Sequence, residues 1–196
     1  EAPNRGLLEA RGLVLYQGGR PLCRPLDLTL EQGERLAILG RNGAGKSTLL
    51  RLCAGEDVAY TGTFYRAPGL EQNIVPQQTH HLRGGLRDLA RQQQVEESLL
   101  LALLRQMGLE RRHLERPVEQ MSEGQRKKVL LALAFCRPYM LYLWDEPMNY
   151  IDVITRMQLE EAVQDSRATM VFVEHDSAFV RHTATKTVEL APFSQG

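Results

Sequence analysis

No stretch of this sequence is apolar over the length that a membrane-spanning helix requires, which is about 20 residues. The longest apolar run, VLLALAF at 129–135, is followed within two residues by Arg137. The N-terminal residues EAPNRG include neither a methionine nor the apolar region of a secretory signal. We therefore predict a chain without a membrane segment and expect it to be part of a longer polypeptide.

The sequence also lacks a surplus of one charge and a cysteine framework. The 24 Lys and Arg residues balance the 24 Asp and Glu residues, so the net charge predicts no general attraction to nucleic acid or to anionic membranes. Three cysteines, at positions 23, 53 and 136, are odd in number and far apart, which favours reduced thiols in a cytoplasmic protein. The 196 residues, 43% of them hydrophobic, suffice for a single domain over 1–196.

Hydrophobic patterns predict strands that alternate with helices. Strands are expected at 7–16, 26–32, 34–40, 61–66, 73–77, 140–145, 169–175 and 185–190, and helices at 46–55 and 151–165. Alternation of this kind predicts an α/β fold with a parallel core sheet. Antiparallel signals concentrate near the N-terminus, and a helical subdomain is expected at about 79–137.

The segment GRNGAGKS at 40–47 fits the phosphate-binding pattern G-x-x-x-x-G-K-[ST] between a predicted strand and a predicted helix. Glycines let the backbone bend so that N–H groups point at phosphates, and the N-terminus of the helix adds positive charge. Lys46 is predicted to reach the β- and γ-phosphates of ATP, and Ser47 to bind Mg²⁺. The predicted ATP-binding residues of this P-loop (Walker A motif) are Asn42, Gly43, Ala44, Gly45, Lys46, Ser47 and Thr48.

A second motif, LYLWDE at 141–146, carries two acidic residues at the end of a predicted buried strand. Ligands bind at this end of the strands in parallel α/β sheets. We expect Asp145 to hold Mg²⁺ and Glu146 to polarise the water that attacks the γ-phosphate. Together with the P-loop, these residues predict an enzyme that hydrolyses ATP.

The third motif, MSEGQRKKVLLALAF at 121–135, places Ser122, Gly124 and Gln125 at the start of a predicted helix. A capped helix end with a hydroxyl and an amide is an anion site. This motif resembles the signature, usually LSGGQ, of ATP-binding cassette (ABC) ATPases. In that family it crosses a head-to-tail dimer and binds the γ-phosphate of the other domain's ATP, so hydrolysis occurs at composite sites. Glu123 departs from the usual glycine.

The resemblance extends from Tyr16 to His175 and implies further site residues. Tyr16 matches the aromatic residue that stacks on adenine, and His175 the histidine that contacts the γ-phosphate. Gln77 matches the glutamine that contacts Mg²⁺ and the attacking water, with Gln78 as the alternative register. The implied catalytic residues are Glu146, His175, Gln77 and Lys46, and the implied metal ligands are Ser47, Gln77 and Asp145.

The segment EPMNYIDV at 146–153 points to one branch of the family. Transport ATPases usually have a form like EPTSALD here, whereas Asn149 is typical of ABC-F proteins, which carry two ATPase domains in one chain and act on ribosomes. The resemblance implies that Asn149 and Asp152 fall in the loop at which the two domains of this family touch. With SEGQRKKV and FVEHD, the segment resembles the second domain of the Lsa/Vga antibiotic-resistance group, which protects ribosomes. The alternative is the nucleotide-binding subunit of an ABC transporter.

Six basic residues near the third motif allow two interpretations. They are Arg111, Arg112, Arg116, Arg126, Lys127 and Lys128. They form either a solvated face or a surface that contacts a phosphate backbone.

Overall fold

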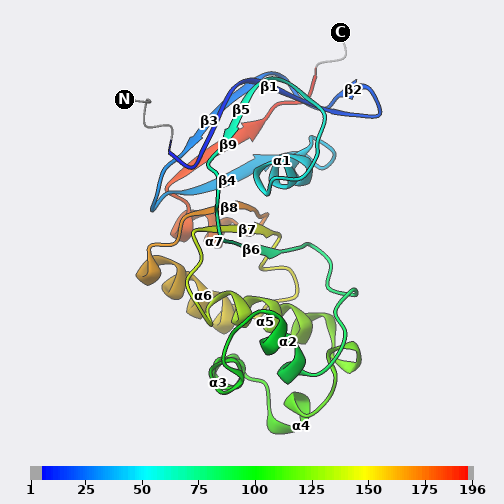
Figure 1. Cartoon of the computed structure of the whole chain (residues 1–196), viewed down its shortest axis with the longest axis vertical. Helices are drawn as coiled ribbons and strands as arrows, with labels where there is room; N and C mark the ends of the chain where they lie inside the picture. The colour runs from blue at the N-terminus through cyan, green and yellow to red at the C-terminus, as the bar shows by residue number, and fades with distance from the viewer. Residues whose placement is uncertain (1–5, 194–196) are drawn as a thin grey trace.

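An antiparallel sheet forms one end of the computed structural model, which describes residues 6–193 (Figure 1). Strand β1 (Leu8–Gln17) pairs in antiparallel orientation with β2 (Arg20–Pro21), β3 (Leu26–Leu30) and β5 (Tyr60–Arg66). The prediction of a longer polypeptide relied on the N-terminal residues, and residues 1–5 lie outside the described residues.

A parallel sheet with the strand order β6–β7–β8–β4–β9 occupies the middle of the molecule (Figure 1). Its strands are β4 (Arg35–Gly40), β6 (Gln72–Val75), β7 (Leu141–Asp145), β8 (Met170–Val173) and β9 (Lys186–Leu190). Helix α1 (Lys46–Cys53) follows β4 and contacts β7 and β8, while α6 (Val153–Ser166) contacts α7 (Ser177–Thr183). The predicted α/β fold, with a parallel core and an antiparallel subdomain, is confirmed.

The chain between β6 and β7 is helical and lies at the end of the molecule opposite the antiparallel sheet (Figure 1). It contains α2 (Leu86–Gln92), α3 (Glu97–Gln106), α4 (Arg111–Leu114), the 3-10 helix η1 (Val118–Gln120) and α5 (Glu123–Ala134). Helix α5 contacts both α3 and β6, so it joins this helical lobe to the parallel sheet.

Strands β7 and β8 contribute to two hydrophobic cores, because successive side chains of a strand point to opposite faces. Leu141, Leu143, Val171 and Val173 pack with α1 and the antiparallel sheet. Tyr142, Trp144, Met170 and Phe172 pack with α5, α6 and α7. The buried indole of Trp144 donates a hydrogen bond from Nε1 to Asn73 Oδ1 at 3.0 Å, which ties β7 to β6. The continuous apolar runs of these strands are therefore explained by burial on both faces.

Element ends differ from the prediction where local chemistry stops the element. The strand predicted at 73–77 ends at Val75, because Pro76 has no N–H to donate. The helix predicted at 46–55 ends at Cys53, and Gly55 follows with φ +86°. Helix α7 was not predicted because seven residues show little periodicity; Asp176 caps it by accepting from Phe179 N at 3.0 Å. No helix within 6–193 has both the length and the apolar character to cross a membrane.

Candidate active site

The glycine-rich loop joins β4 to α1 at the carboxyl edge of the parallel sheet. Gly43 and Gly45 have φ values of +83° and +95°, a left-handed backbone that residues with side chains rarely adopt. No side chain within residues 6–193 caps α1, so its first N–H groups are left for another acceptor. The buried Lys46 side chain folds back over the loop, and its Nζ donates to Gly40 O at 2.7 Å.

A cavity of about 280 Å³ lies against this loop. It is lined by Gln17, Leu22, Asn42, Gly43, Gly45, Lys46, Ser47, Thr48, Gln77, Glu146 and Val173. The structure thus brings most of the predicted P-loop residues together with Gln77 and Glu146. Ala44 is buried, and Tyr16 lies one residue before the lining residue Gln17 without lining the cavity itself.

Ser47, which lines the cavity, is hydrogen-bonded to Asp145. Ser47 Oγ donates to Asp145 Oδ2 at 2.8 Å. Burial raises the pKa of Asp145, and the Ser47 hydrogen bond partly opposes that rise. A hydroxyl and a carboxylate are oxygen ligands of the kind that Mg²⁺ accepts, and a cation there would offset the cost of burying the carboxylate. Within residues 6–193, no group of three or more His, Cys, Asp or Glu residues could hold a metal ion.

The Glu146 carboxylate lies between two of the predicted catalytic residues. Gln77 Nε2 donates to Glu146 Oε2 at 2.7 Å, and His175 Nε2 lies 2.8 Å from Oε1. The glutamine beside Glu146 is therefore Gln77. Glu146 itself has φ +49°, a left-handed backbone that is strained for this residue type, and its N–H donates to Val173 O at 2.7 Å.

Glu174 is a residue that sequence reasoning missed. It is buried, and its carboxylate accepts hydrogen bonds from Met148 N at 2.9 Å, His175 N at 2.9 Å and Asp176 N at 3.1 Å. Burial raises the pKa of Glu174, and the three N–H groups oppose this. Glu174 thus joins the loop after β7 to the loop after β8 and fixes the backbone of His175. An acidic residue next to the apolar run of β8 was the available signal.

The third motif begins α5 with a capping box. Ser122 Oγ accepts from Gln125 N at 3.2 Å, and Ser122 N donates to Gln125 Oε1 at 3.1 Å. The Ser122 hydroxyl proton and the Gln125 amide hydrogens take no part in these two bonds. A Cβ on Gly124 would lie 2.9 Å from Tyr150 O, so glycine permits the close approach of α5 to the loop after β7.

Glu123, which departs from the family motif, sits in the first turn of α5. Its carboxylate accepts from Thr79 Oγ1 at 3.0 Å and pairs with Arg126 Nη2 at 3.1 Å. Arg126 Nε in turn donates to Thr79 Oγ1 at 3.2 Å. The Glu123 side chain therefore faces the segment after β6 with its charge paired, and the capping box at the start of α5 still forms.

Both interpretations of the basic cluster are wrong for Lys127, which is 0% exposed. Burial lowers its pKa, and the charges of Glu174, Asp145, Glu146 and Glu123 oppose this. Lys128 is largely buried and pairs with Asp152 Oδ1 at 2.9 Å. Arg111, by contrast, has a side chain 85% exposed and pairs with Glu115, so it belongs to a solvated face.

The loop after β7 carries the predicted contact residues Asn149 and Asp152. Asn149 N donates to Glu146 O at 3.2 Å. Asp152 caps α6 by accepting from Thr155 N at 3.0 Å. Although burial acts against ionisation, hydrogen bonds from Lys128 and Thr155 lower the pKa of Asp152 to about 2. Four hydrophobic side chains near this loop are exposed, namely those of Tyr150, Val153, Ile154 and Met157.

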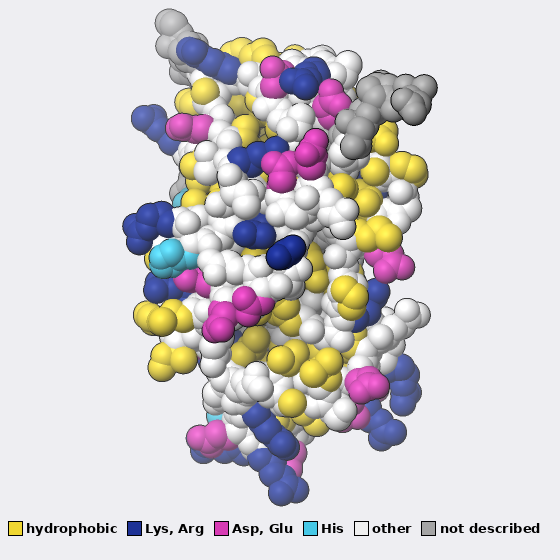
Figure 2. Space-filling view, turned by 90° about the vertical axis from the view of Figure 1, so that its left-hand side faces the viewer, with side chains coloured by type: hydrophobic (Ala, Val, Ile, Leu, Met, Phe, Trp, Pro, Cys, Tyr) yellow, Lys and Arg dark blue, Asp and Glu magenta, His cyan; other side chains and the backbone are white. Residues whose placement is uncertain are grey.

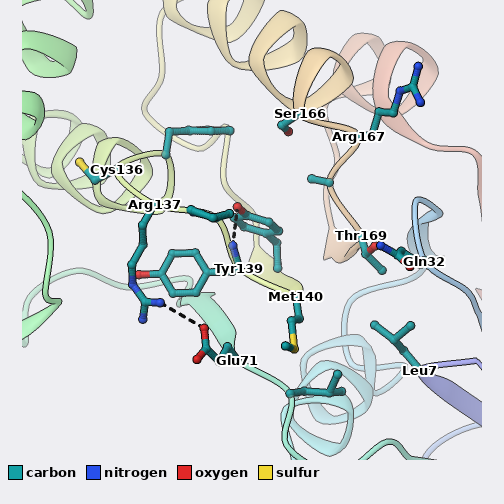
Figure 3. A pocket seen from close by; sticks show the side chains of 15 residues that line it. Leu7, Gln32, Glu71, Cys136, Arg137, Tyr139, Met140, Ser166, Arg167 and Thr169 are labelled. Atoms are coloured by element: carbon teal, nitrogen blue, oxygen red, sulfur yellow. Dashed lines mark hydrogen bonds and ion pairs between the residues drawn. The ribbon is translucent and has the colours of Figure 1, made fainter.

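A larger cavity, of about 850 Å³, lies at the opposite edge of the sheet (Figure 3). Its lining comes mostly from the loops that enter β6, β7 and β8, with Leu7 and Gln32 beside them, and contains none of the predicted site residues. Figure 2 looks at the molecule from a side on which basic, acidic and hydrophobic groups are mixed, with no single basic stripe.

This chain is similar to known ATP-binding proteins. A family model described as "ABC transporter" matches residues 23–149. The chain is 28% identical to ABC transporter F family member 2 of Arabidopsis thaliana, covering 95% of this chain and 28% of that protein. It is also 28% identical to the ribosome protection protein VmlR of Bacillus subtilis, covering 94% and 34%. Identity is 34% with the aliphatic sulfonates import ATP-binding protein SsuB 1 of Agrobacterium fabrum, covering 85% and 64%.

Solved structures give the same fold. The ATP-binding subunit of an ABC transporter matches with a TM-score of 0.75 at 26% identity, covering 94% of this chain and 86% of that one. A dimeric ATP-binding cassette bound to ADP and Pi matches with a TM-score of 0.77 at 20% identity, covering 94% of both chains. The chain spans about a third of the length of the first curated relatives that it matches.

Proposed function

Because this chain belongs to the ABC transporter family and has the fold of its ATPase domains, we propose that it binds Mg-ATP at residues 40–47 and hydrolyses it in a site completed by a second ABC domain. The observation that carries this proposal is the position of Glu146. Its carboxylate lies within 2.8 Å of both Gln77 and His175, beside the cavity that the P-loop lines.

Residues of the P-loop supply the positive charge that ATP requires. Lys46 exchanges its hydrogen bond to Gly40 O for bonds to the β- and γ-phosphates, and the N–H groups at the start of α1 donate hydrogen bonds to phosphate oxygens. Ser47, Asp145 and Gln77 would hold Mg²⁺, which when bound neutralises phosphate charge in the transition state. Tyr16, next to the lining residue Gln17, is proposed to stack on adenine.

Glu146 is proposed as the general base for the attacking water. Gln77 orients that water, and His175 contacts the γ-phosphate once it is present. The bonds that both side chains now make to Glu146 hold the carboxylate at the cavity. Removal of such a base typically lowers a rate by about 10²–10⁴-fold.

We propose that a second domain completes the site, and this is consistent with Ser122, Gly124 and Gln125 lying outside the lining of the cavity at their own P-loop. We propose that they bind the γ-phosphate of the partner domain's ATP and that the partner returns the same contact. Asn149 and Asp152, on the loop that touches Gly124 through Tyr150, lie beside this junction. A dimeric relative in a post-hydrolysis state supports this arrangement.

Within the family we propose the ABC-F branch, with action on the ribosome and a role in antibiotic resistance as in the Lsa/Vga group. Support comes from EPMNYIDV at 146–153 and from relatives named as ABC transporter F family member 2 and ribosome protection protein VmlR. This function implies a cytoplasmic protein. The match to SsuB 1 favours the second candidate, a nucleotide-binding subunit of a transporter.

The deciding experiment uses the full-length polypeptide with Glu146→Gln and the matching change in its other ABC domain. Slow hydrolysis should trap the ATP-bound dimer, which is then sedimented with ribosomes and, separately, with membranes. We expect ATP-dependent sedimentation with ribosomes, which is lost with ADP. ATP-dependent sedimentation with membranes, and none with ribosomes, would instead establish the transporter function.

A further inference from the structure

We propose that Lys127 is a positioning residue for ATP hydrolysis, which ties the backbones of Gln77 and Glu146 to helix α5. This inference rests on the proposed function, since it concerns the same site.

The contacts of Lys127 are to main-chain atoms of the two residues whose side chains meet in the site. Its Nζ donates to Gln77 O at 3.3 Å and to Glu146 O at 3.2 Å. The side chains of Gln77 and Glu146 touch at 2.7 Å. One ammonium group thus connects the two backbones, and the two side chains connect to each other, so three hydrogen bonds close a ring through Lys127, Gln77 and Glu146.

The surroundings of Lys127 make these contacts necessary for its own burial. The side chain is 0% exposed, and the residues that follow it in α5, Val129 to Ala134, belong to the hydrophobic core. A buried ammonium without hydrogen-bond partners is strongly unfavourable. Its two described acceptors are the carbonyls of Gln77 and Glu146. Movement of either carbonyl away from Nζ therefore removes a hydrogen bond from the buried ammonium group, so Lys127 resists such movement.

The restraint acts where the backbone is strained. Glu146 has φ +49°, and its carbonyl accepts from Asn149 N at 3.2 Å as well as from Lys127. Without Lys127, this carbonyl retains only the bond from its own turn among the contacts described. The peptide can then rotate toward an unstrained conformation, and the Glu146 carboxylate moves with it. Displacement of a catalytic group by about 1 Å can lower a rate by about 100-fold.

Lys127 also links two sites. It lies two residues after Gln125, at the end of α5 that is proposed to bind the partner domain's ATP. Seating of α5 against the partner's phosphate is therefore transmitted through one side chain to Gln77 and Glu146. In this way the capture of one nucleotide sets the geometry for hydrolysis of the other.

The test is Lys127→Met in the intact polypeptide, because methionine fills a similar volume without hydrogen bonds or charge. ATPase kcat and KM, the Kd for ATP and the thermal midpoint are measured together. The ATPase rate of Glu146→Gln gives the activity that does not come from this site, and it is subtracted from the other rates. We expect the remaining rate of Lys127→Met to be roughly tenfold or more below that of wild type, while the Kd for ATP and the thermal midpoint stay close to wild type. Lys127→Gln, which keeps a donor, should recover part of the rate.

The matched control is Arg111→Met, which removes an exposed member of the same basic cluster and should leave kcat unchanged. A kcat near wild type for Lys127→Met overturns the proposal, as does a loss of stability and ATP affinity in parallel with kcat. If Lys127→Met does not fold, Lys127→Gln carries the same comparison. Failure of the proposed function is distinct, since the unaltered polypeptide would then show no Mg-dependent ATPase activity.

Discussion

The two edges of the parallel sheet differ in the kind of hollow that each contains. At the amino edge, where the parallel strands begin, the cavity of about 850 Å³ is the larger one. Two of its charged side chains are already engaged within the chain, since Arg137 lies over the Tyr139 ring at 4.2 Å and pairs with Glu71 at 3.3 Å (Figure 3). At the carboxyl edge, the hollow of about 280 Å³ gathers Lys46, Ser47 and Glu146. The convergence of charged groups and free backbone donors, rather than volume, therefore distinguishes the candidate site.

Replacing Glu146 with Gln tests the carboxyl edge most severely. Gln cannot accept the proton from water, so we expect the ATPase rate of the intact polypeptide to fall by about 10²–10⁴-fold. ATP affinity should change little, because the side chain is not proposed to bind phosphate. Single-turnover hydrolysis and equilibrium binding measure the two effects. A variant that keeps its rate would remove Glu146 from the chemistry.

Replacing Lys46 with Ala separates binding from chemistry. A charged hydrogen bond to phosphate contributes about 1.5–3 kcal/mol, so the Kd for ATP should rise by about 10- to 100-fold. Titration with a fluorescent ATP analogue measures this in the 196-residue chain.

The isolated domain should bind ATP yet hydrolyse it slowly unless it self-associates, because the partner's signature is missing. Full turnover by a strictly monomeric domain would contradict the composite site.

Asp145→Asn should weaken Mg²⁺-dependent ATP binding and yet stabilise the nucleotide-free fold. Burial raises the pKa of Asp145 in the folded state, so ionisation disfavours folding as pH rises above the usual range of an aspartate. We expect a higher thermal midpoint than wild type at pH 7, and a gap that narrows as pH falls and Asp145 becomes protonated. The exposed Asp57→Asn is the control. A lower midpoint at pH 7 would contradict the expectation.

The amino edge should respond least. Among the described residues, Tyr139 Oη is buried without a hydrogen-bond partner, so Tyr139→Phe should change the free energy of unfolding by less than about 1 kcal/mol and leave hydrolysis unchanged. Tyr142→Phe is the matched comparison, because Tyr142 Oη accepts from Tyr139 N at 3.2 Å. Loss of the Tyr142 hydroxyl should lower the free energy of unfolding by about 1–3 kcal/mol if the Tyr139 N–H stays unpaired. Urea denaturation measures both. Loss of ATPase activity in Tyr139→Phe would show that the two edges are coupled.

Features that follow from local sequence were predictable. The glycine pattern of residues 40–47, the apolar strand before Asp145 and the capped start of α5 each signal their structure through neighbouring residues. Lys127 and Glu174 were not predictable, because their burial depends on contacts with segments distant in the sequence. The partner of Glu123, Thr79, is 44 residues away for the same reason. The amino-edge cavity, built from several separate loops, left no pattern in the sequence.

The alternation of side chains along β7 and β8 has a consequence for how the chain tolerates change. One residue faces the antiparallel sheet and the next faces the helices, so the two lobes share a single wall. Insertions in the helical excursion between β6 and β7 leave that wall intact and can alter what the domain touches. A substitution in β7 or β8 disturbs the core that its side chain faces, and a shift of the strand itself disturbs both cores. The helical segment between β6 and β7 should therefore tolerate sequence changes, whereas strands β7 and β8 should tolerate few.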